Sequence, residues 1–443
     1  MSSRVALTTF GCKANQADTL ALKDAVATAA GDDVAFAGPR EHSGLDVVVV
    51  NTCTVTHTAD ADARQLIRKY RRASPDARIV VTGCYAQTDR DALEAMPEVD
   101  HIVGNIDKSA IPAMVARLLR GEEPTPAFER PGHRDWNPTL RDAASIRTLR
   151  AGRSRPFVKV QDGCDYVCSF CIIPQARGAS RSLPMDDVVA TMQQYAQLGA
   201  QEVVLTGIHL GHWGRDLKPR RRFSEMLLEL LERTDVPRYR ISSLEPNEVD
   251  NEVIALAANH PRVCPHLHVP LQSGDDGILA AMRRVYRTPM YATKNQRFAD
   301  AIPLGAWGID VMVGFPGEDD AAFEQTYRYL RGLQLTYLHV FPYSPRRNTP
   351  AAGMPNQVDP RVKRERVTRL TALSNERRSL HATRSIGSQG HVVVEDRRVD
   401  GRLRGFTESY VPVLFEGPDS LYNSLVAVEI TDAQGINGIG HRL

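Results

Sequence analysis

Short apolar runs alternate with longer amphipathic stretches along the first 120 residues. Three runs rich in β-branched residues predict strands: VALTTFG (5–11), DVVVVNT (46–52) and ARIVVTG (77–83). Helix-like stretches such as ALKDAVATAA and ADARQLIRKYRRA separate them. Such alternation is typical of a parallel sheet. We therefore predict an α/β domain over residues 1–120.

The periodic pattern stops between residues 121 and 153. GEEPTPAFERPGHRDWNPTLRD is rich in proline and charge and keeps no hydrophobic period. This composition predicts a linker over 121–153.

The alternation resumes after residue 153 with six candidate strands. They are FVKVQ (157–161), EVVLTG (202–207), YRISSLE (239–245), HLHVPLQ (266–272), GIDVMVGFP (308–316) and YLHVFPYS (337–344). Helix-like segments such as DDVVATMQQYAQLGA and FSEMLLELLERT lie between them. This pattern predicts a partial or complete (β/α) barrel over 154–384, with its active site at the C-terminal strand ends.

The chain then changes character twice. Residues 361–384 predict a basic helix, with eight Arg or Lys against two Glu. From 385 to 443, short strands such as GHVVVEDRRV and SLVAVEITDA are separated by turns. We predict a small β-barrel over 385–443.

Composition sets the broad class of the protein. The chain has 443 residues, of which 42% are hydrophobic and 24% charged, with a net charge of +2. These values are typical of a soluble multidomain protein. No apolar run reaches about 18 residues, and the first residues lack the apolar core of a signal peptide. We expect a cytoplasmic protein, where disulfides are rare and seven cysteines point to metal or redox chemistry.

Three cysteines each follow a predicted strand of the first domain: Cys12, Cys53 and Cys84. The carboxyl ends of parallel strands meet at one edge of a sheet, so one site can gather them. The alternative is that they are small buried hydrophobic residues. We expect Cys264, which stands apart, to be such a core residue.

The motif GCDYVCSFC places Cys164, Cys168 and Cys171 in a C-x3-C-x2-C spacing after the first strand of the second block. Three thiolates can hold three irons of a cubane cluster, which normally has four cysteine ligands. The fourth iron is then open, and an open position on a metal usually marks chemistry. The alternative is zinc, but zinc prefers four ligands and no fourth lies nearby in the sequence.

These motifs resemble the radical S-adenosylmethionine (SAM) methylthiotransferases over nearly the whole chain. The stretches that carry the resemblance are GCKANQ (11–16), NTC (51–53), TGC (82–84), GCDYVCSFCIIPQARG (163–178), LTGIHLG (205–211), SSLEP (242–246), HVPLQSG (268–274), MRRVY (282–286) and VGFPGE (313–318). Residues 287–310 match the family only loosely. The resemblance implies an α/β fold with an N-terminal parallel-sheet domain, a radical SAM partial barrel and a C-terminal TRAM-like β-barrel.

The resemblance also implies the cofactors. One [4Fe–4S] cluster would bind Cys12, Cys53 and Cys84, and a second would bind Cys164, Cys168 and Cys171 and hold SAM. One SAM would donate a methyl group to sulfur, and another would supply the radical that removes a substrate hydrogen. The reaction then needs a reductant protein or other electron donor, and a sulfur donor.

Polar residues at the predicted strand ends are candidates for SAM contacts. They are Thr206, Gly207, Ser243, Glu245 and Gln272. The alternative for Glu245 and Gln272 is that they only satisfy neighbouring groups of the barrel.

The substrate is inferred from GCKANQ, which resembles the type acting on N6-threonylcarbamoyladenosine in tRNA. Isopentenyladenosine in tRNA and an aspartate of a ribosomal protein remain alternatives. A third, from another class, is an RNA-binding protein with structural or redox-sensing clusters. We expect tRNA as partner, and neither a membrane nor DNA.

Basic runs support an RNA partner, since phosphates bind Arg and Lys. They are Arg220–Arg222, the group Arg283, Arg284 and Arg287, and the helix over 361–384. The alternative is a solvated charged face. Tyr410 and Phe415 are either base-stacking or core residues.

Overall fold

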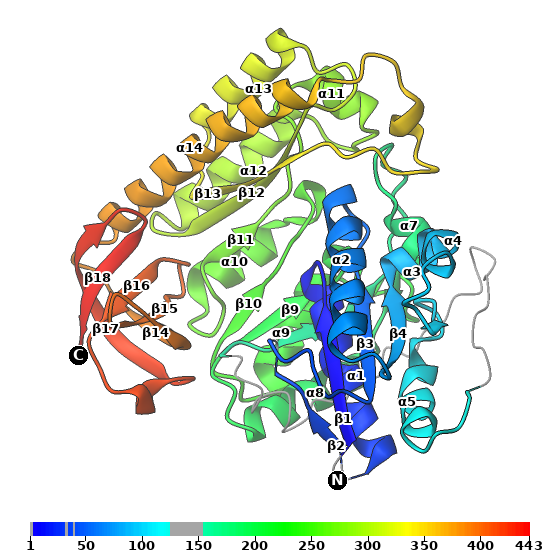
Figure 1. Cartoon of the computed structure of the whole chain (residues 1–443). Coiled ribbons are helices and arrows are strands. Elements are labelled where there is room, and N and C mark those ends of the chain that lie inside the picture. Colours follow the sequence, from blue (N-terminus) through cyan, green and yellow to red (C-terminus); the bar gives the residue numbers. More distant parts are fainter. Residues whose placement is uncertain (1–2, 32–33, 39, 125–153) are drawn as a thin grey trace. The chain divides into compact units, whose positions relative to one another are not determined.

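The computed structural model describes residues 3–31, 34–38, 40–124 and 154–443 (Figure 1). The chain packs into two compact units. Unit 1 is formed by 1–148, 159–183 and 344–352, and unit 2 by 149–158, 184–343 and 353–443. Most of the predicted linker, from residue 125 to 153, lies outside the described residues.

Unit 1 contains a five-stranded parallel sheet in the order β2-β1-β3-β4-β5. Its strands are β1 (Ser3–Thr9), β2 (Val34–Phe36), β3 (Val47–Thr52), β4 (Arg78–Gly83) and β5 (His101–Ile102). The three strands predicted from the sequence are β1, β3 and β4, so the α/β prediction is confirmed. The two others are only three and two residues long, and they carry no run long enough to predict a strand.

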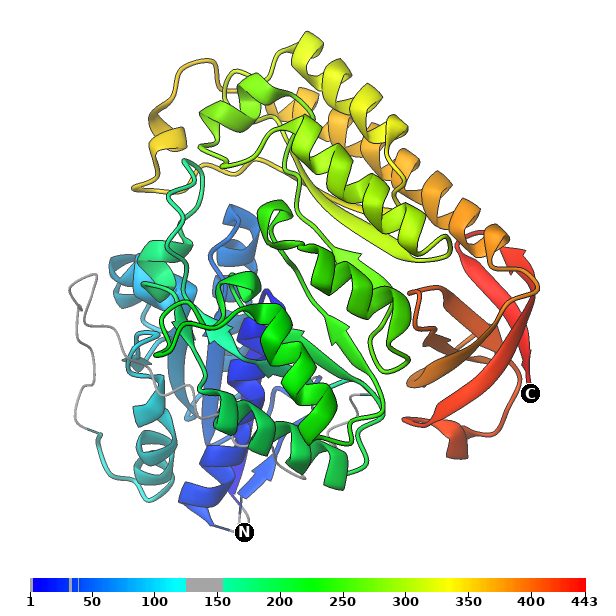
Figure 2. The same cartoon turned by 180° about the vertical axis from the view of Figure 1, so that it is seen from behind.

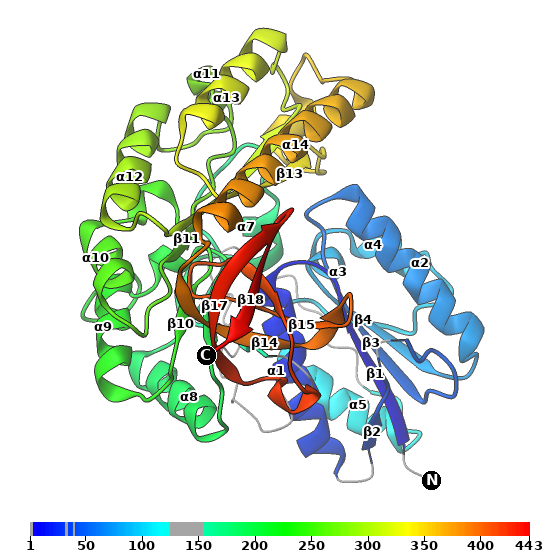
Figure 3. The same cartoon turned by 90° about the vertical axis from the view of Figure 1, so that its left-hand side faces the viewer.

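Helices cover both faces of this sheet (Figure 3). Helices α1 (Lys13–Ala30) and α5 (Ile111–Leu119) pack on one face, and α2 (His57–Ala73), α3 (Cys84–Thr88) and α4 (Arg90–Glu94) pack on the other. Successive valines of β3 enter the two cores in turn: Val47 and Val49 on one side, Val48 and Val50 on the other. Because both faces of β3 are buried, its valines form a continuous apolar run in the sequence.

The predicted barrel strands are present, most of them shorter than expected. They are β6 (Phe157–Lys159), β9 (Val203–Thr206), β10 (Tyr239–Ile241), β11 (His266–His268), β12 (Ala306–Val313) and β13 (Tyr337–Pro342). They form two parallel sheets, β10-β9-β6 and β11-β12-β13. An isolated parallel bridge between Ser243 and His268 links the chain after β10 to the end of β11. This open arrangement confirms the partial-barrel prediction.

The helices of unit 2 follow the strands (Figure 2). They are α8 (Met185–Gln197), α9 (Phe223–Arg233), α10 (Asn251–Asn259), α11 (Asp276–Ala281), α12 (Thr288–Ala301), α13 (Asp320–Gly332) and α14 (Pro360–Arg384). The predicted basic helix is α14, and the Asp359 side chain caps its start by accepting from the Arg361 N–H. No helix among the described residues is both long and apolar enough to span a bilayer.

Residues 389–442 close into a small barrel in the order β14-β15-β16-β18-β17. Its strands are β14 (Gln389–Val399), β15 (Arg402–Phe406), β16 (Pro412–Phe415), β17 (Leu425–Gln434) and β18 (Asn437–Arg442). The predicted β-barrel is therefore confirmed. Phe415 belongs to its core. The Tyr410 ring stacks on the rings of His266 and Phe406, at 4.3 and 4.8 Å between centroids, so both aromatic residues pack within unit 2.

Candidate active site

The first three cysteines lie at the carboxyl edge of the unit 1 sheet. Cys12 caps α1, Cys53 follows β3 directly, and Cys84 is the first residue of α3. Gly11 has a φ of +91°, and a Cβ there would lie 2.6 Å from the Cys53 sulfur. The glycine therefore lets the chain bearing Cys12 approach Cys53 closely.

Burial makes the Cys53 thiol a poor acid. Cys53 is 5% exposed, and its pKa is raised to about 12 by burial and by the nearby Cys84 and Cys12. The thiolate form of Cys53 is therefore stable only with positive charge close to its sulfur. Iron supplies that positive charge and binds the deprotonated form. The chemistry of this donor set thus fits an iron–sulfur cluster.

The second cysteine motif forms an irregular loop in unit 1. It runs from β7 (Gln161–Asp162) to α7 (Ile173–Arg177), and β7 pairs with β8 (Arg181–Ser182). The Cys164 N–H donates to the carbonyl of Gly178 (3.0 Å), and the Cys171 N–H donates to that of Cys168 (3.1 Å). The predicted single strand 157–161 is thus split into β6 and β7. Because β7 and β8 pair at the two ends of this segment, the three cysteines lie on one short loop.

Gly163 shows how tightly this loop is packed. Its φ is +73°, and a Cβ there would lie 1.9 Å from the carbonyl oxygen of Ala179. Only glycine avoids both the backbone strain and this collision. The glycine before the first cysteine is therefore a structural requirement of the loop.

A buried ion network joins the two cysteine segments inside unit 1. Arg177 donates to both carboxylate oxygens of Asp162 (2.9 and 3.0 Å) and to Asp18 (3.0 Å). Lys108 donates to Asp18 at 2.7 Å, and Lys159 pairs with Asp18 and with Asp162. The sequence analysis did not identify these residues as a site, because they are far apart along the chain.

The predicted SAM contacts follow the strand ends of unit 2. Thr206 ends β9, next to Gly207, and Ser243 forms the parallel bridge with His268. Gln272 has a φ of +72°, and its Oε1 is buried with no hydrogen-bond partner among the described residues. Glu245 instead pairs with Arg284. The geometry therefore leaves an acceptor available on Gln272, whereas Glu245 already has a cationic neighbour.

Two histidine–carboxylate clusters in unit 2 were missed by the sequence analysis. In the first, Glu248 Oε1 lies 2.7 Å from His209 Nε2 and 3.2 Å from His212 Nε2. The spacing of His209 and His212, three residues apart, was the available signal.

The second cluster lies on neighbouring strands of one sheet. Asp310 Oδ1 is 2.8 Å from His268 Nε2 and 3.3 Å from His339 Nδ1. Trp307, three residues before Asp310 on β12, packs instead against Phe298 of α12. Because side chains alternate along a strand, the cluster occupies the sheet face opposite α12.

Some residues of the basic runs form ion pairs. Arg284 is buried and bound to Glu245, so its predicted role in binding phosphate is wrong. Arg221 and Arg222 pair with Glu229 and Glu225. In α14, Arg366 is buried against Glu318 and Asp320. Burial therefore removes Arg284 and Arg366 from any phosphate-binding surface, whereas Arg220, Arg283 and Arg287 are exposed.

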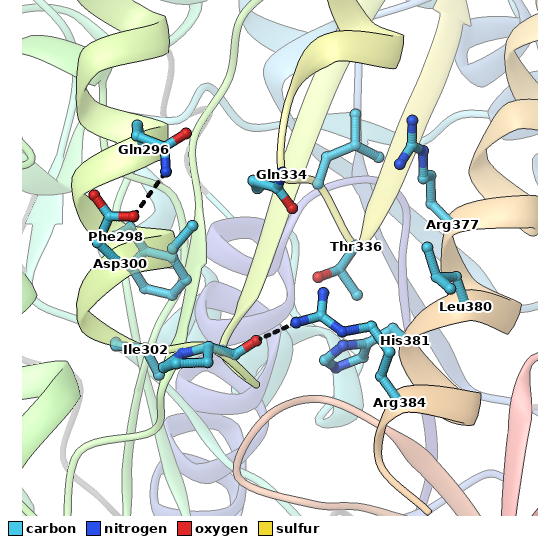
Figure 4. Close-up of a pocket in the computed structure, with 14 residues that line it drawn as sticks. Gln296, Phe298, Asp300, Ile302, Gln334, Thr336, Arg377, Leu380, His381 and Arg384 are labelled. Carbon is cyan, nitrogen blue, oxygen red and sulfur yellow. Dashed lines mark hydrogen bonds between the residues drawn. The ribbon is translucent and has the colours of Figure 1, made fainter.

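Figure 4 shows a pocket of about 230 Å³ in unit 2, between α12 and α14. Gln334 and Thr336, which precede β13, line it together with Arg377 and Arg384 of α14. Arg384 donates to the carbonyl of Pro303 (2.7 Å). The pocket lies at the amino ends of β12 and β13, so it is not at the carboxyl edge expected for the active site.

A parallel partial barrel together with a C-x3-C-x2-C loop defines the class of protein as a radical SAM enzyme. The model of the radical SAM superfamily matches residues 158–330, and that of an uncharacterized protein family, UPF0004, matches residues 4–104. The chain is similar in fold to the radical SAM methyltransferase TsrM from Kitasatospora setae. The TM-score is 0.58 at 17% identity, covering 80% of this chain and 74% of the other.

Proteins of similar sequence identify the family within the radical SAM enzymes. The chain is 36% identical to a threonylcarbamoyladenosine tRNA methylthiotransferase of Bacillus subtilis, over 97% of this chain and 94% of that protein. It is 30% identical to a tRNA-2-methylthio-N(6)-dimethylallyladenosine synthase of Carboxydothermus hydrogenoformans, over 96% of each. The chain belongs to the family of radical SAM tRNA methylthiotransferases. It is therefore an enzyme of sulfur-group transfer that uses [4Fe–4S] clusters and SAM.

Proposed function

We propose that this enzyme replaces the hydrogen on carbon 2 of N6-threonylcarbamoyladenosine, next to the anticodon of tRNA, with a methylthio group. The observation that carries the proposal is the 36% identity, over 97% of the chain, to a relative named for this modified base. The motif GCKANQ at 11–16 supports the same substrate. The proposal places the enzyme in the cytoplasm with its tRNA.

The proposed cluster ligands are the two cysteine triads. Cys12, Cys53 and Cys84 share the carboxyl edge of one sheet, while Cys164, Cys168 and Cys171 share one loop. Cys164, Cys168 and Cys171 would hold a cluster that, when bound, would supply the one-electron reduction of SAM needed to break the substrate C–H bond. The chain itself orients the ligands and keeps the buried thiols of Cys53 and Cys84 away from water.

We propose that SAM contacts the strand-end residues of unit 2. Thr206, Gly207 and Ser243 lie at the ends of β9 and β10, the expected place in a (β/α) barrel. The buried acceptor of Gln272 suits an N–H donor. Glu245 keeps its place in the proposal with its charge balanced by Arg284.

The proposed domains are an N-terminal methylthiotransferase domain over 1–120, a linker over 121–153, a radical SAM barrel over 154–384 and a TRAM-like barrel over 385–443. We propose tRNA, a reductant and a sulfur donor as partners, and neither a membrane nor DNA.

The cluster of His268, Asp310 and His339 supports a polar substrate. A threonylcarbamoyl group carries a carboxylate, a hydroxyl and urea N–H groups, whereas a dimethylallyl group is apolar. Two imidazoles and a carboxylate on one sheet face can exchange hydrogen bonds with the former.

The test is the analysis of tRNA nucleosides by mass spectrometry in a deletion strain complemented with variants. We expect methylthiolated threonylcarbamoyladenosine to disappear on deletion and to return with the wild-type gene. Cys84→Ala and Cys168→Ala should not restore it. Cys264→Ala, a buried cysteine outside both triads, should restore it.

Other outcomes would overturn the proposal. Loss of methylthiolated isopentenyladenosine alone would assign the enzyme to the other tRNA substrate, and loss of a methylthiolated ribosomal aspartate would assign it to a protein. If the purified enzyme, reduced and given SAM without oxygen, forms no 5′-deoxyadenosine, the clusters are structural or redox-sensing.

A further inference from the structure

One buried ion cluster of unit 1 contains, among the described residues, more cations than carboxylates. Four cations, Lys108, Lys159, Arg177 and Arg181, surround two carboxylates, Asp18 and Asp162. All six side chains are at most 13% exposed. Burying an unbalanced charge costs several kcal/mol, so an anionic group beside these cations would be stabilised.

Arg177 connects the loop that carries Cys164, Cys168 and Cys171 to the segments that carry the N-terminal triad of Cys12, Cys53 and Cys84. Its Nη2 donates to Asn15 Oδ1. The Asn15 amide in turn donates to the carbonyls of Phe10 (2.9 Å) and Thr52 (2.8 Å). These carbonyls lie two residues before Cys12 and directly before Cys53. The last residue of α7 is therefore bonded, through one side chain, to two of the three cysteine-bearing segments.

The third cysteine is tied to the same place. Asn105 Nδ2 approaches Cys84 Sγ (3.6 Å) and donates to the carbonyl of Ala176 (2.8 Å), the residue before Arg177. The Nε of Arg177 is buried and has no hydrogen-bond partner among the described residues. A buried N–H of a cation without a partner is suited to an anionic group.

The electrostatics agree with this geometry. Burial opposes the charged form of Arg177, yet Asp162, Asp18 and the thiolates of Cys84 and Cys12 raise its pKa above the ordinary value. Arg177 in turn acts to lower the pKa of Cys53, against the larger effect of burial.

We propose that Arg177 is a positioning residue that raises the reduction potential of a [4Fe–4S] cluster on Cys12, Cys53 and Cys84. The inference rests on the proposed ligation of that cluster. A cluster gains one negative charge when it is reduced, and a buried cation nearby stabilises the reduced form. Asp18, which belongs to the same ion network, carries a negative charge and therefore lowers the reduction potential of the cluster.

The experiment measures the midpoint potential of this cluster by a redox titration followed by electron paramagnetic resonance. The full-length chain carries Cys164→Ala, Cys168→Ala and Cys171→Ala, so that one cluster gives the signal. Arg177→Gln should lower the midpoint and Asp18→Asn should raise it. We expect each change to alter the ratio of reduced to oxidised cluster at a fixed potential roughly tenfold, or 59 mV for a one-electron couple.

The opposite signs separate electrostatics from damage. Both substitutions break the same network, so a merely structural role would move the midpoint in one direction or reduce the iron content alike. Arg177→Lys, which keeps the charge, should remain near the parent value. Arg117→Gln, which removes a surface partner of Glu122 in the same unit, is the matched control and should leave the midpoint unchanged.

Two results overturn the inference in distinguishable ways. Unchanged midpoints, or shifts of the same sign, in iron-replete Arg177→Gln and Asp18→Asn refute the role of Arg177 while the cluster assignment stands. A parent chain that binds no iron refutes the ligand assignment itself, and the inference with it. If Arg177→Gln alone fails to bind iron, Arg177→Lys and Asp18→Asn decide the test.

Discussion

The Glu202 side chain is completely buried, and two arginines stabilise its charged form. Its oxygens accept from Arg238 Nε (2.6 Å) and Arg240 Nε (2.7 Å). Burial acts to raise its pKa, but Arg240 and Arg238 lower it below the usual range. Glu202→Gln would leave the buried Arg240 without a carboxylate partner among the described residues, and Arg238 with only Glu408, 3.7 Å away. We therefore expect a loss of about 3–5 kcal/mol in the free energy of unfolding.

Chemical denaturation followed by circular dichroism measures this loss. The matched control is Glu229→Gln, because Glu229 also pairs with two arginines, Arg221 and Arg233, but is 21% exposed. Exposed pairs contribute about 0–1 kcal/mol. Equal shifts of the denaturation midpoint in the two variants would contradict the argument.

The protonation of Glu248 makes the stability of the folded state depend on pH. Burial raises its pKa to about 7, although His212, Arg215 and Arg284 act to lower it. The folded state therefore holds the proton more tightly than the unfolded state, where the value is near 4.5. The resulting stabilisation is present below about pH 4.5 and is lost as pH rises through about 7.

The comparison with Glu248→Gln isolates this effect, because both proteins keep His209 and His212. We expect the stability of the wild type relative to the variant to fall by about 3 kcal/mol between pH 4.5 and 8. Thermal melting at a series of pH values provides the measurement. A difference that stays constant with pH would show that Glu248 does not titrate in this range.

The backbone conformation of the loop that carries Cys164, Cys168 and Cys171 depends on a glycine at position 163. In Gly163→Ala the added Cβ would collide with the Ala179 carbonyl at a φ of +73°. We expect the variant to lose about half of its iron, that of the loop, and to keep the N-terminal cluster. Iron analysis and 5′-deoxyadenosine formation are the readouts.

Gly121→Ala is a matched control for this element. Gly121 belongs to the same unit and has a φ of +75°, but a Cβ there meets nothing within 4 Å. Backbone strain alone is therefore the same in the two variants. If Gly121→Ala loses as much iron as Gly163→Ala, the collision with Ala179 is not the cause.

At the scale of elements, the sequence predicts what is local. Long apolar runs identified β1, β3 and β4, and the cysteines that follow them lie at the expected edge. Strands of two or three residues, such as β2 and β5, leave no periodic signal. The break between β6 and β7 was likewise not visible, since Val160 continues the alternation of apolar Val158 and polar Lys159.

The ion pairs escaped prediction for a different reason. Arg177 and Asp18 are 159 residues apart, so no spacing rule connects them. Arg284 sits in a run of basic residues that resembles a solvated face, yet it is buried against Glu245. Charge pairing of this kind depends on tertiary packing, which composition and periodicity do not encode.

At the scale of the whole chain, the C-terminal barrel is anchored to the radical SAM strands within unit 2. Arg238 donates to the carbonyls of His391 (2.6 Å) and Phe406 (3.2 Å), and Arg240 donates to those of Thr407 and Glu408 (both 3.0 Å). The barrel therefore satisfies buried donors of the same arginines that hold Glu202. Its removal is a structural change as well as the loss of a candidate RNA-binding module.

We therefore predict that a chain ending at Ser385 melts several degrees lower than the full-length protein. Each hydrogen bond lost by a charged donor costs about 1.5–3 kcal/mol, and Arg238 and Arg240 lose four. Because this destabilisation confounds any loss of tRNA binding, the sharper variant carries Arg397→Gln, Arg402→Gln and Arg442→Gln in the intact barrel. It should keep the melting temperature and weaken tRNA binding, with the salt dependence reduced by about one for each arginine that contacts a phosphate. A truncated chain that melts like the full-length protein would show that the barrel is dispensable for the stability of unit 2.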